Sequence, residues 1–208
     1  RLTTLDLSKF DTSNVTNMEA MFYDCKNLTE LDLSSRDTSR VTNMGVMFHG
    51  CNSLTELDLS KFNTSKVTDM EDMFEWCNSL TELDLSNFDT SNVTNMEYMF
   101  ADCRSLTKLD LSNWDTSKVT NMQEMFGKWC NSLTTLDLSN FDTSNVTNMD
   151  RMFSNMWNLT TIYTSEKFTI WKETKTDEMF IDTKEIKWWA WTTYDENHTD
   201  EEYARPDE

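Results

Sequence analysis

The sequence predicts an α/β repeat solenoid, with a parallel β-sheet on one face and short helices on the other. A pattern of about 26 residues recurs along most of the chain, and the phrase LDLSNFDTSNVTNM stands unchanged at residues 83–96 and 136–149. Each copy holds a strand-like segment followed by a helix-like one. Repeats of this length signal solenoids, because each unit buries its apolar face only by stacking on its neighbours.

The repeats predict that the 208 residues form one continuous, elongated domain. Their first residues are 26 or 27 positions apart: Leu2, Leu28, Leu54, Leu80, Leu106, Leu133 and Leu159. We expect a repeat array of about six units over residues 1–165. Residues 166–208 are expected to form a degenerate last repeat and a C-terminal cap. Tryptophans of the KWWAW stretch would cover the apolar end of the sheet.

The strand of each unit is predicted from alternation. Leu57 and Leu59 flank Asp58, which is the period of two expected when one face of a strand is buried. The FDTS that follows has turn chemistry, because Asp, Thr and Ser side chains hydrogen bond to nearby backbone groups. We therefore expect a strand and a turn at the start of every unit.

The helix of each unit is predicted from wider spacing. In VTDMEDMFEWC, residues 67–77, the apolar residues recur at steps of three and four, as on one face of a helix. Thr68 followed by Glu71 fits a capping box, in which the two side chains bond the free N–H groups at a helix start. Each unit then reads as strand, turn and short helix.

The bulk charge restricts the partners. A formal net charge of −19 and a pI of about 4.3 disfavour binding to nucleic acid phosphates and to anionic membrane surfaces. No signal peptide or apolar spanning run is recognised. The start at Arg1, directly before a strand, suggests a fragment without its signal or anchor, and no membrane insertion of this fragment is expected.

One position of the repeat holds cysteine in five successive units, and Met156 takes it in the sixth. The residues are Cys25, Cys51, Cys77, Cys103 and Cys130. Neighbouring coils of a solenoid lie close enough for disulfides. An odd number of thiols at a core position that also accepts Met instead favours a structural ladder of buried thiols, with some disulfide or a metal as the alternatives.

A second position holds aspartate in six units. The residues are Asp6, Asp32, Asp58, Asp84, Asp110 and Asp137. Like charges about 5 Å apart repel by roughly 0.8 kcal/mol per pair in water, and by more if they are desolvated. This acidic ladder must therefore face solvent, bond to Ser or Thr, or hold cations. A solvated polar ladder is favoured over an acidic surface for a basic partner or for weakly bound calcium.

The outward positions of the predicted helices vary while the apolar positions repeat. Their aromatic residues are the candidate binding residues: Tyr23, His49, Trp76, Tyr98 and Trp129. Changing aromatic side chains on a fixed core are typical of a recognition face, since Tyr and Trp are frequent binding anchors. The alternative is that solvent-facing positions in repeats drift without a function.

Nothing in the chain supports catalysis. His49 and His198 are far apart in the sequence, and none of the common nucleophile, phosphate-binding or zinc motifs occurs. A regular row of solvated carboxylates lacks the unequal paired environments that acid–base chemistry requires. We predict no enzyme activity, no catalytic residues and no metal site, and no cofactor beyond the calcium considered above.

The repeat closely resembles the BspA-like leucine-rich repeats of bacterial surface proteins. The resemblance rests on the LDLSxFDTSxVTNM core and the MFxxC ending, which cover about residues 1–165. It implies a leucine-rich-repeat solenoid on the bacterial cell surface, extracellular, that binds a host or other surface protein or a glycan and has no catalytic residues. A structural spacer or engineered repeat scaffold is the first alternative, and a calcium-stabilised stalk is the second. The oligomeric state stays open.

Overall fold

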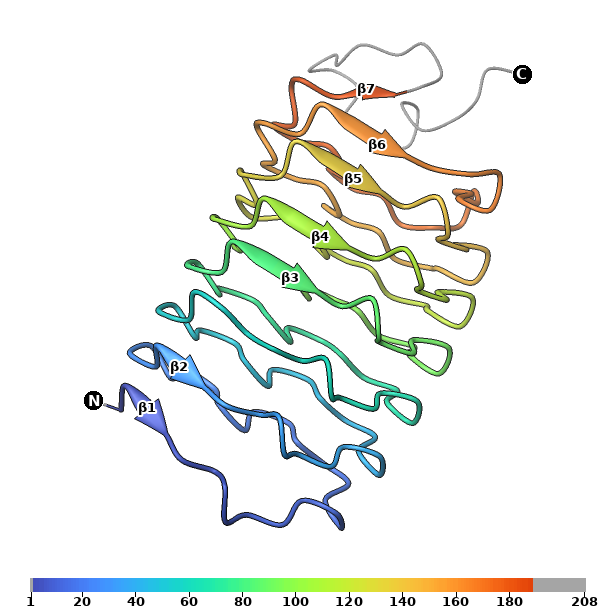
Figure 1. The fold of residues 1–208 in the computed structure, drawn as a ribbon. Helices are drawn as coiled ribbons and strands as arrows, with labels where there is room; N and C mark the ends of the chain where they lie inside the picture. The colour runs from blue at the N-terminus through green and yellow to red at the C-terminus, as the bar shows by residue number, and fades with distance from the viewer. Residues whose placement is uncertain (1, 189–208) are drawn as a thin grey trace.

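The computed structural model describes residues 2–188, which form a stack of coils with one coil for each repeat. The N-terminus lies at one end of the stack, and the last strand lies at the other (Figure 1). The repeat solenoid predicted from the sequence is confirmed. The division at residue 165 stays a prediction, and residues 189–208 of the expected cap lie outside the described residues.

The front of the stack is a row of short parallel strands (Figure 1). They are β1 (Thr4–Leu5), β2 (Glu30–Leu31), β3 (Glu82–Asp84), β4 (Lys108–Asp110), β5 (Thr135–Asp137), β6 (Thr161–Tyr163) and β7 (Lys187–Trp188). Pairing is parallel between β1 and β2, between β3 and β4, and through β5, β6 and β7. Leu83 pairs with Leu109, so the register equals one repeat.

A second ladder runs along the stack after the turn that follows each strand. It consists of single parallel bridges rather than strands, and each bridge joins equivalent residues of adjacent coils. Its members are Asn17, Asn43, Asp69, Asn95, Asn121, Asn148 and Lys175. Most of these side chains also accept the N–H of the residue two positions on, as Asn43 does from Gly45 at 2.7 Å. The two ladders fix the register of every coil.

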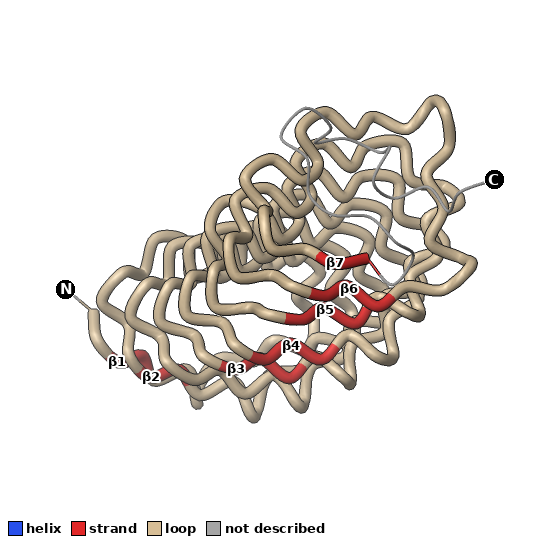
Figure 2. Tube along the Cα trace, turned by 90° about the horizontal axis from the view of Figure 1, so that it is seen from above, coloured by secondary structure: helices blue, strands red, loops and turns tan. Residues whose placement is uncertain are grey.

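The predicted short helices are wrong, because residues 2–188 contain none, and Figure 2 shows only strands and loops. In the third repeat, Met70 and Phe74 donate their N–H groups to Asn95 and Met99 of the next coil, at 3.1 and 3.0 Å. Met73 donates instead to the carbonyl of Met70, at 3.3 Å. Bonds to the next coil therefore alternate with bonds inside the same coil, and this pattern produces successive turns. Such turns also place residues three and four positions apart on one face.

Left-handed backbone at two or more positions in each repeat prevents a helix from forming. Asp72 and Trp76 have φ angles of 53° and 63° in the third repeat. A residue with positive φ cannot continue a right-handed helix. The expected capping box does not form either, since the Thr68 hydroxyl donates to the Thr42 carbonyl of the preceding coil at 3.2 Å.

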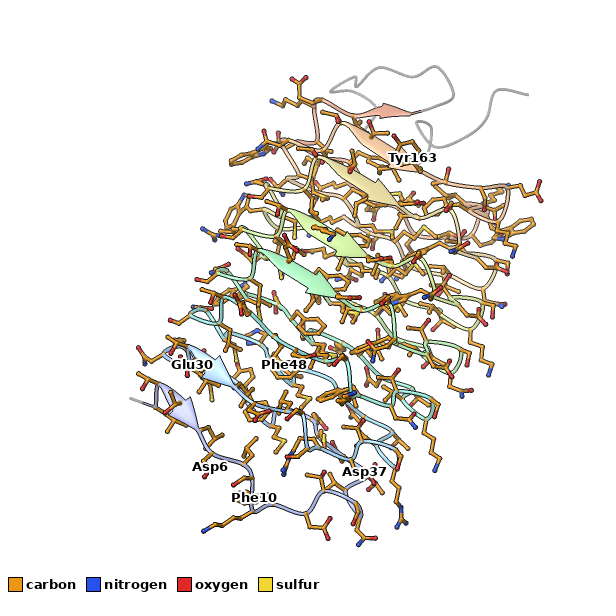
Figure 3. The ribbon with its side chains drawn as sticks, viewed as in Figure 1. Asp6, Phe10, Glu30, Asp37, Phe48 and Tyr163 are labelled. Atoms are coloured by element: carbon orange, nitrogen blue, oxygen red, sulfur yellow. The ribbon has the colours of Figure 1, made fainter. Side chains whose placement is uncertain are left out.

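The core is a narrow spine between the two ladders. A column of stacked phenylalanines runs through it, with adjacent ring centroids 5.2 to 5.9 Å apart. Its members are Phe22, Phe48, Phe74, Phe100, Phe126, Phe153 and Phe180. Figure 3 labels Phe48 inside its coil. Stacked rings add to the burial energy of the column, so the spine stabilises contacts between coils.

A ladder of buried threonines, which the sequence did not predict, joins the corners of the coils. The Thr90 hydroxyl donates to the carbonyl of Asp115 in the next coil and accepts the N–H of the same residue, both at 2.9 Å. The same pair of bonds forms at equivalent residues: Thr38, Thr64, Thr90, Thr116 and Thr143. Each hydroxyl replaces backbone pairing where the chain bends.

None of the segments within residues 2–188 is a helix that could span a lipid bilayer.

Candidate functional site

The variable residues lie on one lateral edge of the stack, where the successive turns lead back towards the sheet. One position of this edge, two residues before the thiol position, is filled differently in each coil. It holds Tyr23, His49, Glu75, Ala101 and Lys128. The next position adopts left-handed backbone at Trp76 and Trp129, with φ angles of 63° and 73°. The scaffold is thus regular, and only the side chains on it change.

Three of the five candidate binding residues form one continuous stack. The ring of His49 lies 4.8 Å from that of Tyr23 at an interplanar angle of 14°, and 5.8 Å from that of Trp76 at 26°. The outer members remain accessible, since Tyr23 is 52% exposed and Trp76 is 44% exposed. We call Tyr23, His49 and Trp76 the aromatic edge.

The other two candidates do not join the stack, and a cation of this chain covers a ring face of each. The Lys128 Nζ lies 4.0 Å from the centroid of the Tyr98 ring, and the Arg104 guanidinium lies 4.8 Å from that of Trp129. Gln123 also donates to the Tyr98 hydroxyl at 2.6 Å. Tyr98 is therefore a packed residue, whereas Trp129 keeps an exposed part.

Ion pairs hold the aromatic edge from behind. The Nε2 of His49 lies 2.9 Å from Oε2 of Glu75, and the other oxygen of Glu75 lies 3.5 Å from Nζ of Lys128. Lys128 belongs to a coil two repeats further on. The intervening position of the edge is Ala101, whose small side chain leaves the lysine room to cross. Lys128 also pairs with the buried Glu124 at 3.4 Å.

The pKa values of His49, Asp72 and Glu75, the titratable cluster behind the aromatic edge, differ from their ordinary values. The hydrogen bond to Glu75 raises the pKa of His49 against the effect of burial. Burial, with the nearby charge of Glu75, raises the pKa of Asp72 to about 7. Burial also acts to raise the pKa of Glu75, but the bonds and charges of His49 and Lys128 outweigh it, so that pKa is lowered. The cluster holds titrating groups near neutral pH.

The acidic ladder lies exposed along the sheet face, where Figure 3 labels Asp6 and Glu30. Each aspartate accepts the N–H of the serine two residues later, at 2.8 to 3.0 Å. Bonds to the serine lower the pKa of Asp84, as they do for four of its equivalents. The residues therefore cap their own turns, and one carboxylate oxygen of each is engaged.

The five cysteines are free thiols, and four of them are buried. Each buried Sγ donates to a phenylalanine carbonyl of the preceding coil, as Cys77 does to Phe48 at 3.2 Å. Burial raises the pKa of Cys51 and of Cys130 to about 12. Such thiols are poor nucleophiles and poor metal ligands, since both roles require the thiolate. Within residues 2–188 no group of three His, Cys, Asp or Glu could hold a metal ion.

Sequence reasoning found the aromatic residues of the edge but missed the charges that support them. Asp72, Glu75 and Lys128 come from positions that read as solvent-facing on a helix. Because the backbone turns instead, Glu75 is buried and contacts both His49 and Lys128. One signal in the sequence could have indicated this contact. Glu75, Ala101 and Lys128 occupy the same repeat position in three successive coils, and the small Ala101 separates two opposite charges.

Comparison with known proteins places the chain in a family. The model of the family described as "Mycoplasma protein of unknown function, DUF285" matches residues 1–107 and 77–192. A leucine-rich cell surface protein of Faecalibacterium prausnitzii A2-165 aligns at 22% identity with a TM-score of 0.49, over 76% of this chain and 39% of that one. A leucine-rich repeat protein of Bacteroides ovatus aligns at 13% identity and a TM-score of 0.26, over 89% and 69%.

The chain spans less than two fifths of the length of the Faecalibacterium protein. No curated protein matches. The family match covers more than half of the residues and includes the BspA-like repeats that the sequence resembles, so that resemblance is confirmed. The chain belongs to the DUF285 family of leucine-rich repeat proteins.

Proposed function

We propose that the chain is a non-enzymatic binding module of a bacterial cell-surface protein, and that its aromatic edge contacts a host or other surface protein or a glycan. The observation that carries the proposal is the exposed stack of Tyr23, His49 and Trp76. Large aromatic side chains supply much of the energy at binding surfaces. The resemblance to BspA-like surface proteins supports the extracellular location that we propose.

The support behind the edge favours binding. His49 is fixed between two rings and paired with Glu75, which Lys128 holds in turn. A surface that is ordered before the partner arrives loses less conformational entropy on binding. A structural spacer would gain nothing from such an arrangement on one edge of an otherwise regular stack.

The proposal is tested by binding of the fluorescently labelled chain to cultured epithelial cells, measured by flow cytometry. We expect the double variant Tyr23→Ala/Trp76→Ala to lose at least tenfold in affinity, since anchor residues each contribute about 2 kcal/mol or more. The matched control is Trp171→Ala. Trp171 is 55% exposed, but it belongs to the segment of the chain between β6 and Lys175 of the bridge ladder, outside the aromatic edge.

Pretreatment of the cells separates the two classes of partner. Loss of binding after trypsin indicates a protein, and loss after mild periodate oxidation indicates a glycan. The proposal fails if the wild type shows no saturable binding, or if Trp171→Ala weakens binding as much as the double variant does. The first result would favour the spacer function, and the second would place the binding surface outside the aromatic edge.

A further inference from the structure

We infer that His49, Asp72 and Glu75 form one coupled cluster that binds two protons, one on His49 and one on Asp72, and that their presence controls the order of the aromatic edge. The site itself is independent of any partner. Its consequence, that binding through the edge is stronger at mildly acidic pH, rests on the proposed function.

The groups around His49 come from several coils. The preceding coil contributes Tyr23 and Asp24, and Asp24 pairs with Lys26 at 3.1 Å. The following coil contributes Asp72, Glu75 and Trp76. Lys128 reaches Glu75 from further along the stack, and the charge of Asp102 acts near Glu75. Three carboxylates surround the imidazole, and Lys26 and Lys128 are the cations beside them.

The atoms that take up the proton are those not engaged elsewhere. Nε2 of His49 is bonded to Glu75, whereas Nδ1 of His49 and Oδ1 of Asp72 are buried without a hydrogen-bond partner. Burial and the charge of Glu75 both act against an ionised Asp72. Two ionised carboxylates in a buried cluster repel each other, so a proton on one of them relieves the pair. Asp72 carries it, because Glu75 is held ionised by His49 and Lys128.

The protonated site favours the ordered edge. An imidazolium between the faces of Tyr23 and Trp76 gains a cation–π attraction that the neutral ring lacks. Loss of both protons adds two units of negative charge beside Asp24. The carboxylates of Asp72 and Glu75 then repel each other, and the stack loses its charged centre. The change operates between mildly acidic and mildly alkaline pH.

The site is tested by NMR titration of the His49 Cε1–H signal in His198→Gln, which removes the second histidine of the chain. We expect the midpoint to lie above that of a histidine peptide under the same conditions. Glu75→Gln should lower it to that of the peptide or below. A midpoint that lies at or below that of the peptide in the parent, or that Glu75→Gln leaves unchanged, overturns the inference.

A second measurement follows the edge itself. The fluorescence that Trp76 contributes, obtained as the difference between the parent and Trp76→Phe, should change with the same midpoint as His49. The equivalent difference for Trp129→Phe is the control and should not follow it. The inference also fails if the Trp76 signal is independent of pH.

The cell-binding assay separates this inference from the proposed function. We expect the affinity of the wild type to be about fivefold higher at pH 6 than at pH 8, within the usual range of coupling between two sites. His49→Gln should abolish this dependence on pH. If binding is lost in Tyr23→Ala/Trp76→Ala but does not depend on pH, the proposed function stands and the proton coupling is wrong. If His49 titrates as expected but no cell binding occurs, the proton-binding cluster stands and the proposed function is wrong.

Discussion

The threonine ladder provides a test of how the coils are joined. Thr90 is 1% exposed, and its hydroxyl makes two bonds to the backbone of Asp115 in the next coil. Thr90→Val keeps the shape of the side chain and removes both bonds. It leaves an N–H group and a carbonyl of Asp115 without their partner at a partly buried corner.

The magnitude follows from these two bonds. Each contributes about 1 kcal/mol net, so we expect the free energy of unfolding to fall by about 2 kcal/mol. The control is Thr94→Val in the same repeat. Thr94 is exposed, and its hydroxyl donates at 3.1 Å to a Thr68 carbonyl that also accepts the Thr94 N–H. Its loss should cost at most about 0.5 kcal/mol.

Urea unfolding followed by circular dichroism measures both variants. Equal slopes against urea would show that the same surface is exposed on unfolding, so the shift in midpoint reports stability. The reasoning is refuted if Thr90→Val loses less than about 1 kcal/mol, below the sum expected for two bonds. It is also refuted if Thr94→Val loses as much.

Three further predictions concern the turns, the thiols and the acidic ladder. Val46 is a β-branched residue with a φ of 59°, so Val46→Gly should relieve strain and stabilise the chain by about 1 kcal/mol in thermal melts, and a lower Tm would contradict this. A thiol reagent at pH 8 should label only Cys25 in the native chain, because burial raises the pKa values of the other four cysteines. Those four should react only on unfolding. Rapid labelling of all five in the native chain would contradict their burial in the core. Millimolar calcium should move the Tm by less than about 1 °C, because each aspartate of the ladder already accepts a serine N–H; a rise of several degrees would instead make the ladder a calcium site.

The repeat could be predicted from the sequence because its period fixes which residues meet. A step of 26 residues places Leu83 beside Leu109, and Phe74 stacks on Phe100 in the same way. The buried positions could also be predicted, since Met70, Met73 and Phe74 all face the core. Apolar spacing reports which side of the backbone is buried, and it does so whatever conformation the backbone takes.

The helices were predicted wrongly for the same reason. Steps of three and four residues suit a helix, but they also suit successive turns that bond to the next coil. The signal against a helix was present at Asp24, Gly50, Asp102, Asn155 and Asp182, which all have positive φ. Gly, Asn and Asp tolerate this conformation best. The equivalent residue in the third repeat is Trp76, so the preference for Gly, Asn or Asp at this position was not evident from every repeat.

The candidate site was only partly predictable. Residue type and variability pointed to Tyr23, His49 and Trp76, and the structure stacks these three. Tyr98 and Trp129 share their residue type, yet Lys128 and Arg104 cover a face of each. Contacts between side chains two repeats apart, such as that of Glu75 with Lys128, depend on the turn geometry. Sequence spacing alone does not contain that geometry.

Cell binding of single variants shows directly whether the aromatic edge is the functional surface. Trp76→Ala and Trp171→Ala each remove one exposed tryptophan from the same scaffold. We expect Trp76→Ala to weaken binding by about tenfold or more while its urea midpoint stays close to that of the wild type, and Trp171→Ala to bind as the wild type does. Equal binding by all three proteins would show that the aromatic edge is not the functional surface.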